Sequence, residues 1–189
     1  IAGLVGEMDR AGIDLAVVQP VATRPGQVAR INDWAASSSS ERVVVFGALH
    51  PGLDDPVAEI ERMVGLGLLG CKMHPEYQEF SPDEPRMLEL LSAVRDAGLV
   101  VLFHAGADLS IPTVRGTPQA FARMLDAVEG LRVVFAHMGG YELWDGVAEH
   151  LLGRDVYLDT SYTLGHLPDD EFVSLARAHG IERVLFGTD

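Results

Sequence analysis

Histidine and aspartate residues follow short apolar runs of this 189-residue chain at a regular spacing. The residues that follow the seven runs, directly or after one residue, are Pro20, His50, His74, His104, His137, Asp159 and Asp189. Imidazole nitrogens and carboxylate oxygens are the ligands that suit a Zn²⁺-like ion. Such an ion lowers the pKa of bound water so that hydroxide is available near neutral pH. The pattern therefore predicts metal-assisted activation of water, if the fold brings these side chains together.

The apolar runs themselves predict the strands that would position these residues, at 15–18, 43–49, 69–73, 99–103, 132–136, 155–158 and 183–187. They lack strict alternation of apolar and polar residues, which is typical of parallel strands buried on both faces. Amphipathic stretches between them, at 59–64, 87–94, 121–128 and 172–178, predict helices. Several helices are expected to end at a glycine, namely Gly12, Gly98, Gly130, Gly153 and Gly180. The repeated helix, glycine and strand indicate a parallel α/β fold.

Two architectures satisfy this order, an open doubly wound sheet and a closed (β/α)₈ TIM-type barrel. Seven consecutive units exceed a small open sheet, and neither GxGxxG nor GxxxxGK[ST] follows any strand. We therefore expect a single barrel domain over residues 1–189. A (β/α)₈ barrel needs eight strands and about 250 residues, so the barrel is expected to be partial: a fragment, or a chain with one degenerate unit. Active sites of barrels lie at the carboxyl ends of the strands, where the histidines fall.

Several ordered segments resemble the amidohydrolase superfamily, in particular amidohydrolase-related proteins of the amidohydrolase-2 type. They are CKMHP at 71–75, LFHAG at 102–106, FAHMGG at 135–140, YLDTS at 157–161 and LFGTD at 185–189. The opening LVGEMDRAGIDLAVVQPVA at 4–22 resembles the helix and second strand of that family. The family includes metal-dependent hydrolases, lactonases and decarboxylases of carboxylated rings.

The resemblance implies roles for three residues. His104, at the end of the fifth barrel strand, would be a metal ligand. Asp189, at the end of the eighth, would ligate metal or take a proton from the nucleophilic water. His137, at the end of the sixth, would be a second ligand in a binuclear site, or would activate water or polarise substrate in a mononuclear one.

The sequence departs from the family pattern in one respect. The family opens with a strand bearing an HxH pair of metal ligands, and this sequence contains no HxH. We expect the first strand and the last helix of the barrel to be missing from these residues, which would leave the metal shell incomplete.

Other polar residues have weaker indications. His74 could contact substrate or bond within its strand-end loop, and Arg115 could pair with a substrate carboxylate or be solvated. Lys72 could be carbamylated to bridge two metals, but an ammonium paired with a carboxylate is favoured. His50 and Asp159 are expected to shape loops. The remaining histidines, His150, His166 and His179, are expected at the surface.

Composition excludes some classes of partner. A formal net charge of −14 argues against nucleic acid, since phosphate binding needs clustered Lys and Arg. The single cysteine, Cys71, allows no internal disulfide, and we see no signal peptide or apolar run long enough for a bilayer. A cytoplasmic protein acting on a small molecule is expected, without nucleic acid or membrane partners, and a homo-oligomer is left open.

These observations lead to one main hypothesis and two alternatives. The main hypothesis is a metal-dependent hydrolase that cleaves a C–N or C–O bond of an amide, lactone or related ester. Its ion would be Zn²⁺, with Mn²⁺ or Fe²⁺ as substitutes, and Asp189 or His137 would move the proton. One alternative is non-oxidative decarboxylation of a carboxylated ring on the same site. The other is a non-catalytic α/β scaffold that lacks a complete metal shell.

Overall fold

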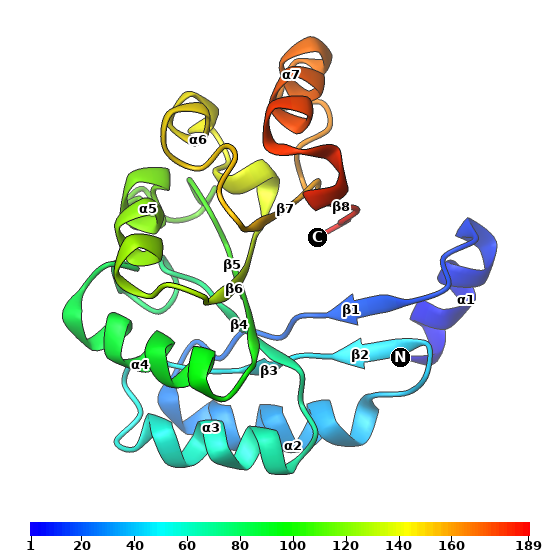
Figure 1. Ribbon diagram of the computed structural model, residues 1–189. Coiled ribbons are helices and arrows are strands. Elements are labelled where there is room, and N and C mark those ends of the chain that lie inside the picture. Colours follow the sequence, from blue (N-terminus) through cyan, green and yellow to red (C-terminus); the bar gives the residue numbers. More distant parts are fainter.

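The computed structural model describes residues 1–189, except for the side chain of Ala2. Helices and strands alternate along these residues (Figure 1). The α-helices are α1 (Ala2–Ala11), α2 (Val28–Ser38), α3 (Pro56–Gly65), α4 (Pro85–Asp96), α5 (Pro118–Ala127), α6 (Trp144–His150) and α7 (Asp169–His179). The strands are β1 (Ala16–Val18), β2 (Val43–Val45), β3 (Gly47–Ala48), β4 (Gly70–Met73), β5 (Val100–Phe103), β6 (Arg132–Phe135), β7 (Tyr157–Asp159) and β8 (Val184–Leu185). Short 3₁₀ turns are η1 (Pro25–Gln27), η2 (His137–Gly139) and η3 (Ile181–Arg183).

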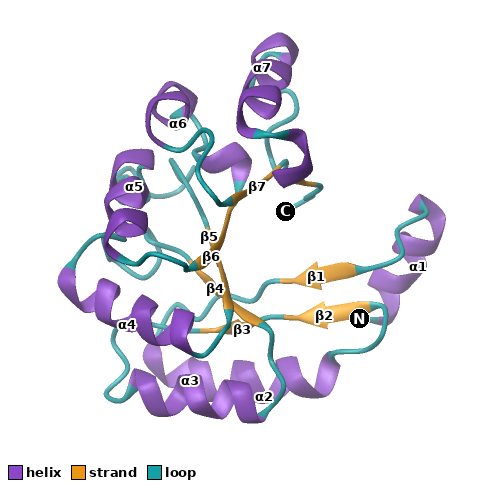
Figure 2. Cartoon of the chain, viewed as in Figure 1, coloured by secondary structure: helices purple, strands orange, loops and turns teal.

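All strand pairs are parallel, in the order β1-β2 and then β3 through β8. β2 and β3 are two parts of one strand separated by Phe46, whose N–H donates to the Val18 carbonyl at 2.9 Å. The seven predicted strands are therefore all present. Figure 2 shows the strands inside and the helices around them. Among the described residues no strand pairing joins β8 to β1, so the sheet is a TIM-type barrel that does not close.

Local sequence explains where the helices begin and end. Pro56 opens α3 after Asp55, whose carboxylate accepts a hydrogen bond from the Ala58 N–H at 3.0 Å. Thr117 caps α5 in the same way, through the Ala120 N–H at 3.2 Å. All five predicted stop glycines have positive φ: Gly12, Gly98, Gly130, Gly153 and Gly180. None of the helices that the structure describes is long and apolar enough to span a membrane.

The two largest of the three hydrophobic clusters follow the alternation along the strands, and the third joins Ala22, Val28 and Ala48. Lys72, Leu102 and Val134 lie in register on neighbouring strands, and Leu102 and Val134 belong to a small cluster with Phe46 and Ala136. The next residues along, among them Phe103 and Phe135, pack against the helices in the large core. Each fully buried phenylalanine contributes about 2–3 kcal/mol to stability by its removal from water.

Candidate metal centre and cavity

The residues that follow β4 and β5 continue the interior layer of the sheet. Met73 and Phe103 pair across these strands, and the His104 N–H donates to the Met73 carbonyl at 3.0 Å. His74 and His104 are therefore neighbours on the interior face. Their rings are parallel within 6°, with centroids 4.0 Å apart.

His137 reaches the same place through an unusual backbone conformation. Ala136 lies in the interior cluster, so strict alternation would turn the next side chain away from it. Instead φ is +59° at His137 and +52° at Met138, a left-handed conformation that costs about 1–3 kcal/mol for a non-glycine residue. The turn brings the His137 ring edge-on to His104, with Nε2 3.0 Å from His104 Nδ1.

Hydrogen bonds from β7 and α6 hold His137 in this conformation. Asp159 accepts from the His137 N–H at 3.2 Å and from the Ser161 N–H at 2.9 Å through the same oxygen. The Trp144 indole N–H donates to the His137 carbonyl at 3.1 Å. Asp159 thus has the loop-shaping role expected from the sequence.

The two rings together are short of one proton. His137 Nδ1 lies 2.9 Å from the Ser161 carbonyl, and His104 Nε2 lies 3.2 Å from the Ala107 carbonyl. Both carbonyl oxygens only accept hydrogen bonds. The Ser161 hydroxyl also lies 3.0 Å from His137 Nδ1. Two neutral imidazoles supply two protons for the three contacts, so one contact lacks a proton and a cation could take its place.

An extra proton is unfavourable here. Burial, with the nearby His74, His137 and Lys72, lowers the pKa of His104 to about 2. Burial is also the main cause that lowers the pKa of His74 to about 4. A divalent ion fits instead, because two nitrogens 3.0 Å apart can share an ion at about 2.0–2.1 Å from each.

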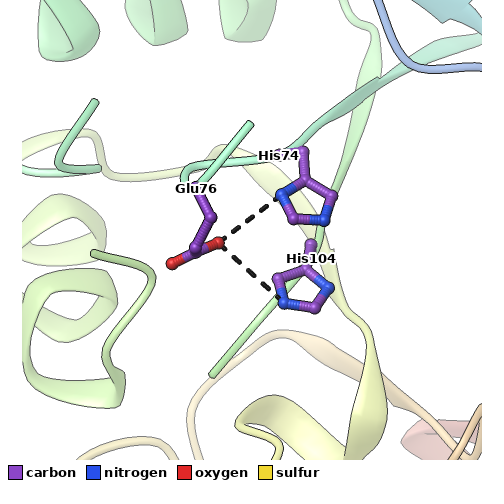
Figure 3. A group of neighbouring side chains, drawn as sticks. All are labelled: His74, Glu76 and His104. Carbon is purple, nitrogen blue, oxygen red and sulfur yellow. Dashed lines mark ion pairs between the residues drawn. The ribbon is translucent and has the colours of Figure 1, made fainter. Parts of the chain in front are cut away.

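Glu76, which the sequence analysis did not single out, adds a carboxylate to this group (Figure 3). Its Oε1 accepts from the N–H groups of Arg115 and Gly116, both at 2.9 Å. Its Oε2 is buried without a hydrogen-bond partner among the described residues. It lies 3.5 Å from His74 Nδ1 and 3.9 Å from His104 Nε2.

His74, Glu76 and His104 thus form a group of metal-ligand type, with ligand atoms all within 4.8 Å of one another. Burial raises the pKa of Glu76. The only sequence cue was its place two residues after His74, across Pro75.

A cavity of about 220 Å³ opens beside the histidines. Three predicted site residues, His104, His137 and Asp189, line it together with Asp108. Its other lining residues are Tyr77, Ala107, Leu109, Ser110, Tyr141 and Tyr162. A larger pocket of about 450 Å³ lies over α5 and α6, among Pro118, Trp144 and Glu171. It holds none of the strand-end residues, whereas His104, His137 and Asp189 line the smaller cavity.

The remaining candidates lie around this centre. Lys72 is buried, and burial lowers its pKa to about 8, against the opposing charges of Asp159 and Asp189. Arg115 does not line the cavity, and its backbone N–H binds Glu76. His50 accepts from the Gly52 N–H at 2.9 Å and so shapes its loop as predicted.

The prediction for His179 was wrong, because this residue is buried and its Nε2 lies 2.9 Å from the Val156 carbonyl. α7 turns this side chain toward the sheet, which the short apolar pattern of the helix did not indicate.

Three solved structures illustrate the similarity of the fold. The 5-carboxyvanillate decarboxylase of Sphingomonas paucimobilis has a TM-score of 0.71 and 21% identity, over 98% of this chain and 71% of that one. The 5-carboxyvanillate decarboxylase of Novosphingobium aromaticivorans, complexed with manganese and 4-hydroxy-3-methoxy-5-nitrobenzoic acid, has a TM-score of 0.74 and 18% identity, over 98% and 68%. A probable 2-pyrone-4,6-dicarboxylic acid hydrolase of Acinetobacter baumannii, with citric acid bound, has a TM-score of 0.68 and 16% identity, over 100% and 72%.

At these identities the solved structures support the barrel fold. A search of curated proteins gave no match. The sequence model of the amidohydrolase family, in contrast, matches residues 5–189. That match covers nearly every element described above, and the chain belongs to the amidohydrolase family.

Proposed function

We propose that this protein is a metal-dependent hydrolase that cleaves a C–N or C–O bond of a small molecule, such as an amide, lactone or related ester. One observation carries the proposal. His104 and His137 bring two ring nitrogens to 3.0 Å of each other, and both residues line a cavity that Asp189 also lines.

His104 Nδ1 and His137 Nε2 would hold the ion, with Asp189 as a further oxygen ligand or as the base. A bound divalent ion would polarise the substrate oxygen and acidify water. Zn²⁺ suits the nitrogen and oxygen donors, and Mn²⁺ or Fe²⁺ could replace it. Asp189 would accept a proton from the attacking water and return it to the leaving group. Tyr141 and Tyr162 would limit the access of bulk water to the cavity.

A second reaction, non-oxidative decarboxylation, is favoured by the aromatic wall of the cavity. Tyr141 and Tyr162 have ring centroids 5.5 Å apart, and Tyr77 stacks on His74 at 3.8 Å. Such walls suit a flat carboxylated ring, and two of the similar structures are decarboxylases. On this reading Asp189 or His137 would deliver a proton to the ring carbon that loses CO₂.

A substrate panel tests the proposal. The purified protein, loaded with Zn²⁺ or Mn²⁺, is incubated with lactones, amides and hydroxylated aromatic carboxylates, with a chelated sample as control. We expect a new carboxylate or amine that depends on metal and is lost in Asp189→Asn. Metal-dependent release of CO₂ would instead establish decarboxylation. If no metal copurifies or binds, and no member of the panel reacts, the protein is a non-catalytic scaffold.

A further inference from the structure

We propose that His104 serves a second cation site through its other ring nitrogen, and that the two sites exclude each other. The inner site is His104 Nδ1 with His137 Nε2. The outer site is His104 Nε2 with His74 Nδ1 and Glu76 Oε2, and the two stacked rings would tilt toward each other to share an ion. The inference rests on the proposed function, because both sites use His104.

The bonding of His74 leaves its Nδ1 without a proton beside the outer site, where an ion would replace the long hydrogen bond from the Tyr77 N–H. Its Nε2 lies 3.6 Å from the carboxylate of Asp108, which only accepts, so the ring proton belongs on that side. The Tyr77 N–H approaches Nδ1 at 3.4 Å, as it would an acceptor. Carboxylates commonly fix the tautomer of a metal-binding histidine in this way. Nδ1 therefore faces Glu76 without a proton.

To the same point Glu76 brings a carboxylate oxygen without a hydrogen-bond partner among the described residues. Its side chain is 0% exposed, and the two bonds to Oε1 fix the plane of the carboxylate. Oε2 is left buried without a hydrogen-bond partner in the described part of the chain. Burying an ionised oxygen without a partner costs several kcal/mol. This oxygen faces His74 Nδ1 at 3.5 Å and His104 Nε2 at 3.9 Å, as the dashed lines of Figure 3 mark. A cation among these three atoms would remove this cost.

The position of the proton on His104 decides which of its ring nitrogens can bind an ion. If His104 carries its proton on Nδ1, that proton is donated to His137 Nε2 across 3.0 Å. Nε2 is then bare, facing Glu76 and the Ala107 carbonyl at 3.2 Å. Two nitrogens and a carboxylate oxygen suit Zn²⁺ or Mn²⁺.

If the proton moves to Nε2, it bonds the Ala107 carbonyl instead, and Nδ1 becomes free for the inner site. A neutral imidazole has one lone pair, so only one face of His104 can bind an ion at a time. An ion in the outer site would hold His104 bonded to His137 and keep the inner nitrogens closed. The outer site would thus regulate loading of the inner one.

Anomalous scattering from zinc-soaked crystals of the purified protein tests both statements. In His137→Ala we expect one zinc peak among His74, Glu76 and His104. In Glu76→Gln we expect the peak beside His137 only, since glutamine keeps the acceptor for Arg115 and Gly116 but places an amide group at the outer site. Glu79→Gln, the same change at an exposed residue, should match the parent protein.

The parent protein should show zinc at one or both positions, with occupancies that sum to no more than one. In solution, the double variant Glu76→Gln with His137→Ala should bind zinc at least about tenfold more weakly than His137→Ala alone. Circular dichroism checks that each variant is folded.

Absence of the outer peak in folded His137→Ala would overturn the outer site, and full occupancy of both positions would overturn the exclusion. Zinc only beside His137 in the parent protein, together with no zinc peak in folded His137→Ala, would refute this inference and leave the proposed function intact. Zinc at the outer site alone in the parent protein would support the outer site and would contradict the proposed catalytic centre.

Discussion

The position of His137 depends on its own backbone torsion angles. A residue in the ordinary extended conformation after Ala136 would turn its side chain away from the interior. The left-handed φ of +59° turns the ring toward His104 instead, and bonds from Asp159 and Trp144 offset the strain. One local conformation thus decides whether the two rings can share an ion.

Substitution of His104 tests the residue on which both proposed sites depend. We expect His104→Ala to lose bound metal, because the change removes a nitrogen from each site, while the fold persists. Metal content per chain by plasma mass spectrometry, with circular dichroism, measures both. His166→Ala removes an exposed histidine and serves as the control. A folded His104→Ala protein that keeps its full metal content would contradict both sites.

At the scale of elements, the loops after β5 and β6 are held together through a close backbone approach at Gly106. Its N–H donates to the Gly116 carbonyl at 2.8 Å, and it forms a bridge with Tyr141. A Cβ at this position would lie 2.2 Å from the Tyr141 nitrogen, and φ is +93°. Only glycine fits here, and the contact sets the distance between the loops that carry His104 and His137.

We expect Gly106→Ala to destabilise the protein by roughly 2–4 kcal/mol, from the left-handed strain and the displaced loop. Urea unfolding monitored by circular dichroism measures this change. Gly6→Ala makes the same substitution within α1, where a Cβ meets nothing within 4 Å, and should be neutral or slightly stabilising. An equal free energy of unfolding for the two variants would show that the approach at Gly106 is not required.

The sequence allowed the elements to be predicted much better than the site. Apolar periodicity and stop glycines located all seven strand positions, because burial and helix termination depend on neighbouring residues. The break at Phe46 was not predicted, since it arises where the strand leaves β1 for β4.

Strand ends indicated His74, His104 and His137 as candidates, and the structure brings them together. Glu76 was missed because its partners, the N–H groups of Arg115 and Gly116, are about 40 residues away in sequence. The turn at His137 was missed for the same reason, because Asp159 and Ser161 stabilise it from another strand.

At the scale of the whole molecule, the buried histidines should make the metal-free protein sensitive to acid. The folded pKa values of His74 and His104 are lowered to about 4 and about 2, from 6.5. Below pH 6.5 the unfolded chain therefore binds protons that the native protein does not. The stability that these groups contribute is present above pH 6.5 and is lost as the pH falls toward the folded pKa values, about 4 for His74 and about 2 for His104.

When the pH is lowered from 7.5 to 5.5, the two imidazoles together should reduce the free energy of unfolding by roughly 2–3 kcal/mol. The raised pKa of Glu76 acts in the opposite direction and reduces the loss. Urea unfolding in EDTA at both pH values measures the change. A double variant, His74→Gln with His104→Gln, should show a flatter pH dependence. Equal slopes for the double variant and the parent would exclude these histidines as the cause.

The two oxygens of Glu76 belong to one rigid carboxylate and serve different parts of the molecule. Oε1 fastens the base of the 107–116 loop, which carries Asp108 and Leu109 into the cavity. Oε2 faces the histidines. Any rotation that brings Oε2 closer to an ion must also lengthen or bend the bonds at Oε1. The loop wall would then shift whenever the ion is gained or lost. The shape of the substrate cavity would therefore depend on whether an ion is bound beside Glu76.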